Sequence, residues 1–299
     1  MNDLSINERF DVHRVITEAI IAAIEAGAGE FVLPWHSSGA AIAKPENART
    51  KMQYHGINVL ALWAKAHSEG FGSGYWASYK QWQQLGAQVE SGQHGTVIVF
   101  YKQMEGDERH EGEHRNRPLA RASRVFNADQ VSGWTSPASV AAKEPVKVIE
   151  AASAFVDATK AIIFHKMEGG AFYDIRCDTI TLPNPILFVG TDASTATEEY
   201  YATLLHELVH WSGANHRLAR KLFDVSKHER ASEELVAEIG AAFLCSDLGV
   251  TNAPRPQHAA YISSWLELLR SDVRAVFTAS RLAHQAAVYL HGLSEPETQ

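Results

Sequence analysis

The sequence has no apolar run that approaches the roughly 18–20 residues of a membrane-spanning helix. Its first residues lack the basic segment and the apolar core of a signal peptide. Only two cysteines occur among 299 residues, Cys177 and Cys245, and they cannot form a disulfide framework. We therefore expect a cytoplasmic protein without a membrane segment.

A basic excess is also missing. The formal net charge is −8, and residues 1–130 hold 13 Lys and Arg against 15 Asp and Glu. Proteins that wrap duplex DNA need a broad cationic surface, so the sequence argues against duplex wrapping. Hydrophobic residues (45%) and charged residues (21%) occur at ordinary levels for a globular protein, and the length allows two domains.

The most informative segment that is present covers residues 206–210, with the sequence HELVH. On a helix, His206 and His210 lie on one face about one turn apart, so both imidazoles can reach one metal ion. Glu207 between them can act as general base on a water held by that metal, as in a zinc peptidase. Gly213 provides a helix stop. Two half-exposed surface histidines are the alternative, but the surrounding apolar residues indicate a buried helix, where histidines without partners are costly.

A third protein ligand has two candidates, of which His216 is the nearer in sequence. It completes the extended pattern H-E-x-x-H-x-x-G-x-x-H, with Gly213 at the turn. Enzymes with that pattern carry a methionine turn beneath the metal. This chain has no methionine beyond Met167, which weakens the case for His216.

The other candidate lies in residues 232–244, where apolar residues recur at helical spacing and predict a buried helix. Glu234 and Glu238 are i,i+4 neighbours close to the apolar face, whereas Glu233 points roughly 100° away. Carboxylates beside a buried stripe need a partner, and a metal with its histidine ligands is a good one. We therefore assign Glu234 as third ligand and Glu238 as the group that holds a ligand imidazole. A pair of carboxylates at the rim of the helix is the alternative, and His216 stays the second candidate.

The chain divides into two predicted domains, 1–130 and 147–299, joined by a linker over 131–146 that is rich in Ser, Ala, Pro and Lys. In the first domain we expect helices over 8–26, 57–68 and 79–85, strands over 96–101 and 123–126, and a polar hairpin loop over 104–118. In the second we expect a helix over 147–160, strands over 161–166, 171–176 and 186–189, and then the HELVH helix and helices over 231–248, 257–270 and 272–290. We expect an α+β fold. The metal-binding motif would lie on the first long helix after the sheet, which is the arrangement of zincin-like domains.

Aromatic residues in the first domain are interleaved with Lys and Arg between residues 31 and 102. Such a mixture suits single-stranded nucleic acid, because bases stack on rings while cations neutralise phosphates. Core packing is the alternative, especially for Trp63 and Trp76, which lie among apolar neighbours. The residues that we select as DNA contacts are Trp35, Arg49, Lys51, Tyr54, Lys80 and Trp82.

Several stretches resemble a known family. The N-terminal domain of the ArdC antirestriction proteins, which also occurs in some plasmid-borne primases, is similar to residues 34–35, 54–58, 76–81, 85–87, 92–96 and 125–130. The metallopeptidase-like C-terminal domain of that family is similar to residues 200–213 and 233–238. The resemblance spans nearly the whole chain.

The resemblance implies a domain that binds single-stranded DNA joined to a zincin-like domain, and a role in protecting incoming plasmid DNA from host restriction during conjugation. It leaves two alternatives open: a DNA-coating shield with a catalytically silent zincin scaffold, and a cytosolic zinc endopeptidase unrelated to DNA. The expected cofactor is Zn²⁺ or another divalent metal such as Mn²⁺. The expected partners are single-stranded DNA and a protein substrate of unknown identity, for which a restriction component is one candidate.

Overall fold

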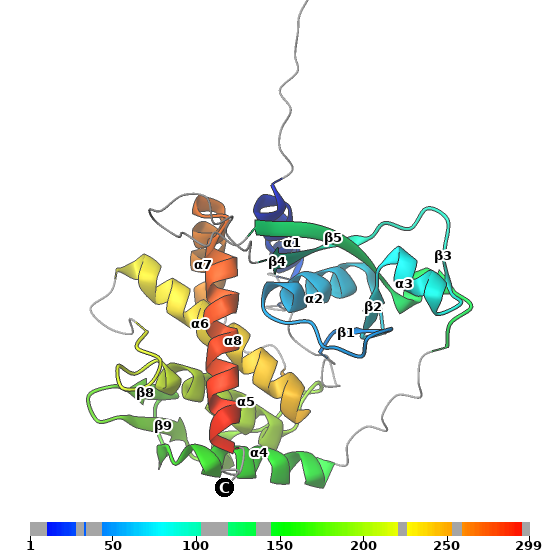
Figure 1. Ribbon diagram of the computed structural model, residues 1–299. Coiled ribbons are helices and arrows are strands. Elements are labelled where there is room, and N and C mark those ends of the chain that lie inside the picture. Colours follow the sequence, from blue (N-terminus) through cyan, green and yellow to red (C-terminus); the bar gives the residue numbers. More distant parts are fainter. Residues whose placement is uncertain are drawn as a thin grey trace, which may run out of the picture.

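The computed structural model describes residues 11–27, 33, 44–102, 119–135, 145–220, 226–252 and 259–294. Helices and strands mix in both parts of the chain, so the α+β prediction is confirmed (Figure 1). The elements of the N-terminal part are α1 (Val12–Gly27), β1 (Glu46–Asn47), α2 (Ile57–Glu69), β2 (Tyr75–Ala77), α3 (Tyr79–Gln84), β3 (Gln88–Val89), β4 (Thr96–Lys102), β5 (Leu119–Asn127), the 3-10 turn η2 (Ala128–Gln130) and β6 (Val131–Ser132).

The N-terminal sheet has the strand order β1-β2-β5-β4, with β4 at one edge. Its long antiparallel ladder pairs Thr96 with Val125 at one end and Lys102 with Leu119 at the other. Ile98 of β4 and Trp76 of β2 are buried in the core that the sheet shares with α1 and α2. The predicted strand over 123–126 lies within the longer strand β5. The predicted loop over 104–118 lies outside the described residues.

Helix α3 begins where its sequence predicts. Ser78 accepts a hydrogen bond from the Gln81 amide, and the Gln81 side chain accepts one from the Ser78 amide, which forms a capping box. Gly86 follows the helix with φ +77°, a left-handed conformation that favours glycine. The predicted linker over 131–146 begins too early, because β6 pairs with β3 and Trp134 packs on Trp82 with ring centroids 5.2 Å apart. The small hydrophobic cluster under α3 needs these residues.

The C-terminal part contains a three-stranded sheet and long helices. Its elements are α4 (Pro145–Thr159), β7 (Ile162–Lys166), β8 (Phe172–Asp174), β9 (Thr179–Pro183), the 3-10 turn η3 (Pro185–Leu187), α5 (Ala196–Ser212), α6 (Lys227–Leu248), α7 (Ala259–Ser271) and α8 (Ala275–Ser294). The strand order is β7-β9-β8, with β9 buried in the middle. Among the described helices, none combines the length and apolarity that crossing a bilayer needs.

The predicted strand over 186–189 is wrong, and the middle strand β9 was missed. Asn184 accepts a hydrogen bond from the Ile186 amide, and Pro185 occupies the first position of the 3-10 turn. Ile186 and Val189 are 76% and 88% exposed, so the apolar run at 186–189 does not enter the core. The shorter, threonine-containing segment of β9 does, with Ile180 and Leu182 fully buried.

The two domains share one continuous hydrophobic core. Trp63 of α2 packs on Phe243 of α6 with ring centroids 5.9 Å apart, and α2 also lies beside α8 (Figure 1). Thr17 of α1 donates a hydrogen bond of 2.7 Å to the Val273 carbonyl, just before α8. Lys44, which precedes the first strand, forms a 2.9 Å ion pair with Asp247 near the end of α6. Helix α6 therefore touches the N-terminal domain at one end.

Candidate metal centre

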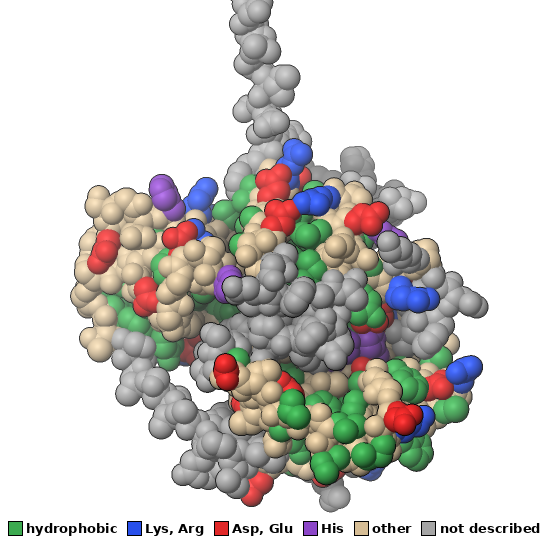
Figure 2. All heavy atoms as spheres, turned by 180° about the vertical axis from the view of Figure 1, so that it is seen from behind, with side chains coloured by type: hydrophobic (Ala, Val, Ile, Leu, Met, Phe, Trp, Pro, Cys, Tyr) green, Lys and Arg blue, Asp and Glu red, His purple; other side chains and the backbone are tan. Residues whose placement is uncertain are grey.

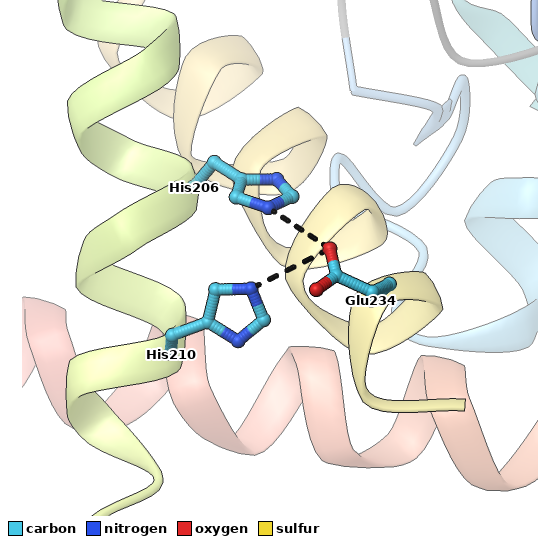
Figure 3. Close-up of side chains that lie close together, drawn as sticks. All are labelled: His206, His210 and Glu234. Atoms are coloured by element: carbon cyan, nitrogen blue, oxygen red, sulfur yellow. Dashed lines mark ion pairs between the residues drawn. The ribbon is translucent and has the colours of Figure 1, made fainter. Parts of the chain in front are cut away.

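The HELVH segment lies on helix α5, as the sequence predicts. Thr195 and Glu198 form a capping box at its start, and Gly213 ends it. His206 and His210 project from one face of α5 toward α6, where Glu234 projects back toward them (Figure 3). Helices α5 and α6 pack directly against each other, which explains why residues 24 or more positions apart meet.

The donor atoms of these three side chains are spaced for a metal ion. The Oε2 atom of Glu234 lies 3.6 Å from Nε2 of His206 and 3.7 Å from Nε2 of His210 (Figure 3). Metal–nitrogen and metal–oxygen bonds of about 2.0–2.1 Å in a tetrahedral site separate neighbouring ligand atoms by about 3.4 Å. Two imidazoles and one carboxylate with these separations therefore fit a divalent transition metal.

The two candidates for third ligand lie at different distances from the histidines. Within the parts of the chain that the structure describes, His206, His210 and Glu234 form the one group of three side chains that could hold a metal, with all donor atoms within 4.8 Å of one another. His216 is elsewhere: its side chain is 65% exposed and lies 3.4 Å from Asp178. The geometry therefore supports the assignment of Glu234 over His216.

Each imidazole also faces a second carboxylate through its other nitrogen. Nδ1 of His206 lies 3.5 Å from Oε2 of Glu238, and Nδ1 of His210 lies 3.2 Å from Oε1 of Glu233. Such carboxylates hold a ligand imidazole in one orientation and one tautomer. Glu238, fully buried, lies where the sequence places it. The expectation that Glu233 points away from the site is wrong, because its carboxylate reaches sideways to His210.

Arg220 holds Glu233, the carboxylate behind His210, in place. The sequence analysis did not identify this arginine. Its guanidinium donates to both carboxylate oxygens of Glu233 at 2.9–3.3 Å and to Oγ of Ser212 at 3.1 Å, and it also donates to the Val209 carbonyl. The Arg220 side chain is only 4% exposed. This arginine lies in a segment without helical or strand periodicity, so no sequence pattern indicates its partner.

The electrostatics of the cluster follow from these pairs. Burial alone would lower the pKa of the His210 imidazole, but hydrogen bonds to Glu233 and Glu234 outweigh it and raise that pKa to about 10. The pKa of His206 is raised in the same way, against the effect of burial, by Glu234 and Glu238. Burial would raise the pKa of the Glu234 carboxyl, but the two imidazoles hold it far below its ordinary value. Without metal, the cluster therefore holds imidazolium–carboxylate pairs at neutral pH.

Metal uptake should consequently release protons, since a ligand imidazole must be neutral. We expect the logarithm of the zinc association constant to rise by about one per pH unit for His210, whose pKa is about 10, and more steeply where His206, whose pKa is also raised, is still protonated. Titration calorimetry in buffers of different ionisation enthalpy measures the protons released. His216→Ala should show the same slope, and a pH-independent affinity would contradict the expectation.

The same histidine pairs stabilise the metal-free fold below about pH 6.5, and this contribution declines as the pH rises toward about 10.

Two further groups lie beside the three donors. Glu207 is 6% exposed, and its charge contributes to the raised pKa values of both histidines. Tyr261 on α7 is positioned by its stacking on Trp265, whose indole donates a 3.0 Å hydrogen bond to the Ala231 carbonyl of α6. Burial raises the pKa of the Tyr261 phenol, and the nearby Glu234 carboxylate raises it further, so the hydroxyl stays protonated. Sequence reasoning found Glu207 and missed Tyr261.

The residues predicted to contact DNA separate into buried and exposed groups. Trp82 is fully buried and its indole donates to the Phe126 carbonyl at 3.0 Å, so it is a core residue rather than a stacking platform. Tyr54 is 7% exposed and its hydroxyl accepts a hydrogen bond from Asn47, so it too is unsuited. Of the remaining predicted contacts, Trp35 lies outside the described residues and three are exposed: Arg49, Lys51 and Lys80.

Charge on the molecular surface is mixed. On the described part of the face shown in Figure 2, Lys and Arg side chains are interspersed with Asp and Glu. This pattern agrees with the net charge of −8 and does not resemble the broad cationic surface of a protein that wraps duplex DNA.

Two families match parts of this chain. Residues 10–126 match the N-terminal domain of the anti-restriction factor ArdC, and residues 150–282 match a zincin-like metallopeptidase. The uncharacterized protein y4eC of Sinorhizobium fredii (strain NBRC 101917 / NGR234) is 42% identical over 94% of this chain and 92% of that protein. The DNA primase TraC of Escherichia coli is 32% identical over 96% of this chain, which corresponds to only 20% of the primase.

Solved structures give the same result over the full length. The metal-free crystal structure of the antirestriction protein ArdC from plasmid R388 is similar with a TM-score of 0.77 and 35% identity, over 95% of this chain and 98% of that one. The Mn(II)-bound structure of that protein gives a TM-score of 0.77 and 33% identity, over 97% and 100% of the two chains. At this identity and coverage, the chain belongs to the ArdC antirestriction family and joins an ArdC-type N-terminal domain to a zincin-like domain.

Proposed function

We propose that this protein protects incoming plasmid DNA from host restriction during conjugation. In this proposal the N-terminal domain binds single-stranded DNA, and the C-terminal domain holds a divalent metal in a peptidase-type site. The observation that carries the second part is the convergence of His206, His210 and Glu234 from two packed helices, with a carboxylate behind each imidazole. Family membership carries the antirestriction role.

The metal would be held by Nε2 of His206, Nε2 of His210 and the Glu234 carboxylate. Two imidazoles and one carboxylate form a ligand set typical of catalytic zinc, and the Mn(II)-bound relative supports a divalent metal. We propose Zn²⁺ as the metal, with Mn²⁺ as the alternative. A metal in this position would polarise a peptide carbonyl and make a water molecule more acidic.

The residues of the chain would supply the proton transfers and the positioning. Glu207 would accept a proton from the attacking water and return it to the leaving nitrogen as the peptide bond breaks. Glu233 and Glu238 would keep the two imidazoles in the orientation that points Nε2 at the metal. The Tyr261 hydroxyl, which stays protonated, is available as a hydrogen-bond donor beside Glu234. The substrate would be a protein at the entering DNA, for which a restriction component is one candidate.

A conjugation assay tests whether the C-terminal chemistry serves protection. Plasmid transfer into restricting and non-restricting recipients is compared for wild type, Glu207→Ala and the surface variant Glu168→Ala. Glu207→Ala removes the general base without touching the predicted ligands, so we expect it to lose protection in restricting recipients only, while Glu168→Ala protects fully. Full protection by Glu207→Ala, with unchanged DNA binding, would contradict the peptidase part and assign protection to a DNA-coating shield with a silent zincin scaffold.

A further inference from the structure

Strands β4 and β5 carry basic residues but no acidic ones, although the protein as a whole is acidic. These two strands carry Lys102, Arg121 and Arg124 and no Asp or Glu, although the chain as a whole has a net charge of −8. Two strands with basic and no acidic side chains can attract a polyanion locally, although the net charge of the molecule repels it. The repulsion from distant acidic groups is screened beyond about 8–10 Å at physiological salt. The charge of these two strands therefore makes them a candidate surface for a polyanion.

One face of these two strands also has a hollow. Val97, Ala122, Ser123 and Arg124 line a shallow groove of about 250 Å³. Val97 pairs with Arg124 across the ladder, so both side chains lie on the same face of the sheet. The Arg124 guanidinium donates a 3.2 Å hydrogen bond to the Gly95 carbonyl, which fixes an exposed cation beside the groove. We call the face that carries Val97, Ala122, Arg124 and Phe126 the Arg124 face.

Aromatic rings continue this face beyond the groove. Phe126 follows Arg124 by two residues and is only half-buried, so its ring adjoins the cation. The Tyr79 ring, at the start of α3, lies 6.4 Å from the Phe126 ring in an edge-to-face arrangement and is 44% exposed. The Gln88 amide donates to the Tyr79 hydroxyl at 3.0 Å, which holds the exposed ring in place. Figure 1 shows α3 beside the end of β5, which agrees with the contact between the Tyr79 and Phe126 rings.

We propose that the Arg124 face is the surface on which the N-terminal domain holds single-stranded DNA, with a phosphate at Arg124, a base in the groove and a neighbouring base on Tyr79. The inference rests on the proposed function and names the site for it. A cation for the backbone beside rings for the bases is the combination that binds unpaired strands without reading sequence. Paired bases in a duplex cannot stack on Tyr79, so the surface prefers single strands. Trp82 and Tyr54, which the sequence suggested as contacts, lie in the interior.

The ladder supplies a matched control for this proposal. Arg121 lies three residues before Arg124 on the same strand, is also exposed, and points to the opposite face because side chains alternate along a strand. Arg124→Gln and Arg121→Gln therefore remove the same charge from the same strand on different faces. Tyr79→Ala removes the ring, whereas Tyr79→Phe keeps it.

Fluorescence anisotropy with a labelled 20-nucleotide oligothymidylate and the full-length protein measures the effects. We expect Arg124→Gln to weaken binding about tenfold or more and to reduce the slope of log K against log salt by about 0.7, the value for one phosphate contact on a single strand. Tyr79→Ala should weaken binding by about 5- to 100-fold, and Tyr79→Phe and Arg121→Gln should bind like wild type. Circular dichroism checks that each variant is folded.

Two results would overturn the inference in distinguishable ways. Equal losses for Arg124→Gln and Arg121→Gln, or no loss for either, with a wild type that binds, would move the DNA site away from the Arg124 face and leave the proposed function standing. The groove would then suit another occupant, such as a peptide strand. Wild-type protein that fails to bind the oligonucleotide at low salt would remove the DNA-binding part of the proposed function together with the site.

Discussion

Glu234→Ala is expected to weaken zinc binding by roughly 100- to 1,000-fold. A four-ligand zinc site is worth about 10–16 kcal/mol in zinc-binding peptides, so each ligand contributes about 3–4 kcal/mol. Glu234 supplies the oxygen that lies 3.6 and 3.7 Å from the two imidazole nitrogens, and the other described carboxylates of the cluster are directed at the opposite ring nitrogens. No other described side chain is placed to replace it. Competition with a fluorescent zinc indicator measures the loss.

His216→Ala is the control that decides between the two candidates for third ligand. It removes an imidazole that is 65% exposed and lies beside Asp178, so zinc affinity should be unchanged within about twofold. Glu233→Gln should lower zinc affinity by about 10- to 100-fold, a loss between those of His216→Ala and Glu234→Ala. Glu233 acts on the metal only through His210. A His216→Ala variant that loses zinc while Glu234→Ala retains it would refute the assignment of Glu234.

The second large effect is expected on stability. Arg220→Met should lower the free energy of unfolding of the metal-free protein by about 3–5 kcal/mol, because it removes one of the two cationic partners of the buried Glu233 carboxylate and leaves only the His210 imidazole. The Ser212 hydroxyl and the Val209 carbonyl lose a donor in the same step. Arg176→Met, which breaks a pair with Asp174 at an arginine that is 86% exposed, should leave the free energy of unfolding nearly unchanged. Denaturant unfolding monitored by circular dichroism compares the two.

Arg220→Lys refines the stability test. Lysine keeps the charge but cannot reproduce the forked contacts to Glu233, so an intermediate loss is expected. If Arg220→Met is no less stable than Arg176→Met, Arg220 does not support the centre in the way that its contacts indicate.

Local signals account for what the sequence predicted well. Capping residues and apolar periodicity lie within a few positions of each other, so the start of α3 and the presence of the long helices could be placed from the chain alone. The spacing of His206 and His210 is likewise local. Glu234 followed from the argument that a carboxylate beside an apolar stripe needs a partner.

The failures have two causes: contacts between distant segments, and one local turn that was not recognised. A helical wheel gives the direction of the Glu233 Cβ but not the reach of its carboxylate toward an arginine 13 residues earlier. The exposed run at 186–189 is more apolar than β9, yet the 3-10 turn at Pro185 keeps it out of the sheet. Aromatic composition could not reveal that Trp82 faces the cluster under α3 while Tyr79, three residues earlier, faces solvent.

The core that joins the two domains holds their described parts against each other at several points. Thr17, Lys44 and Trp63 of the N-terminal domain are tied to the helices of the zincin-like domain by a hydrogen bond, an ion pair and ring packing. Under the proposed function, these contacts would hold a bound strand at a set distance from the peptidase centre. Only a protein that sits within one fixed reach of the DNA strand could be cleaved. Selection would then depend on where a target stands along the strand rather than on a recognised peptide sequence.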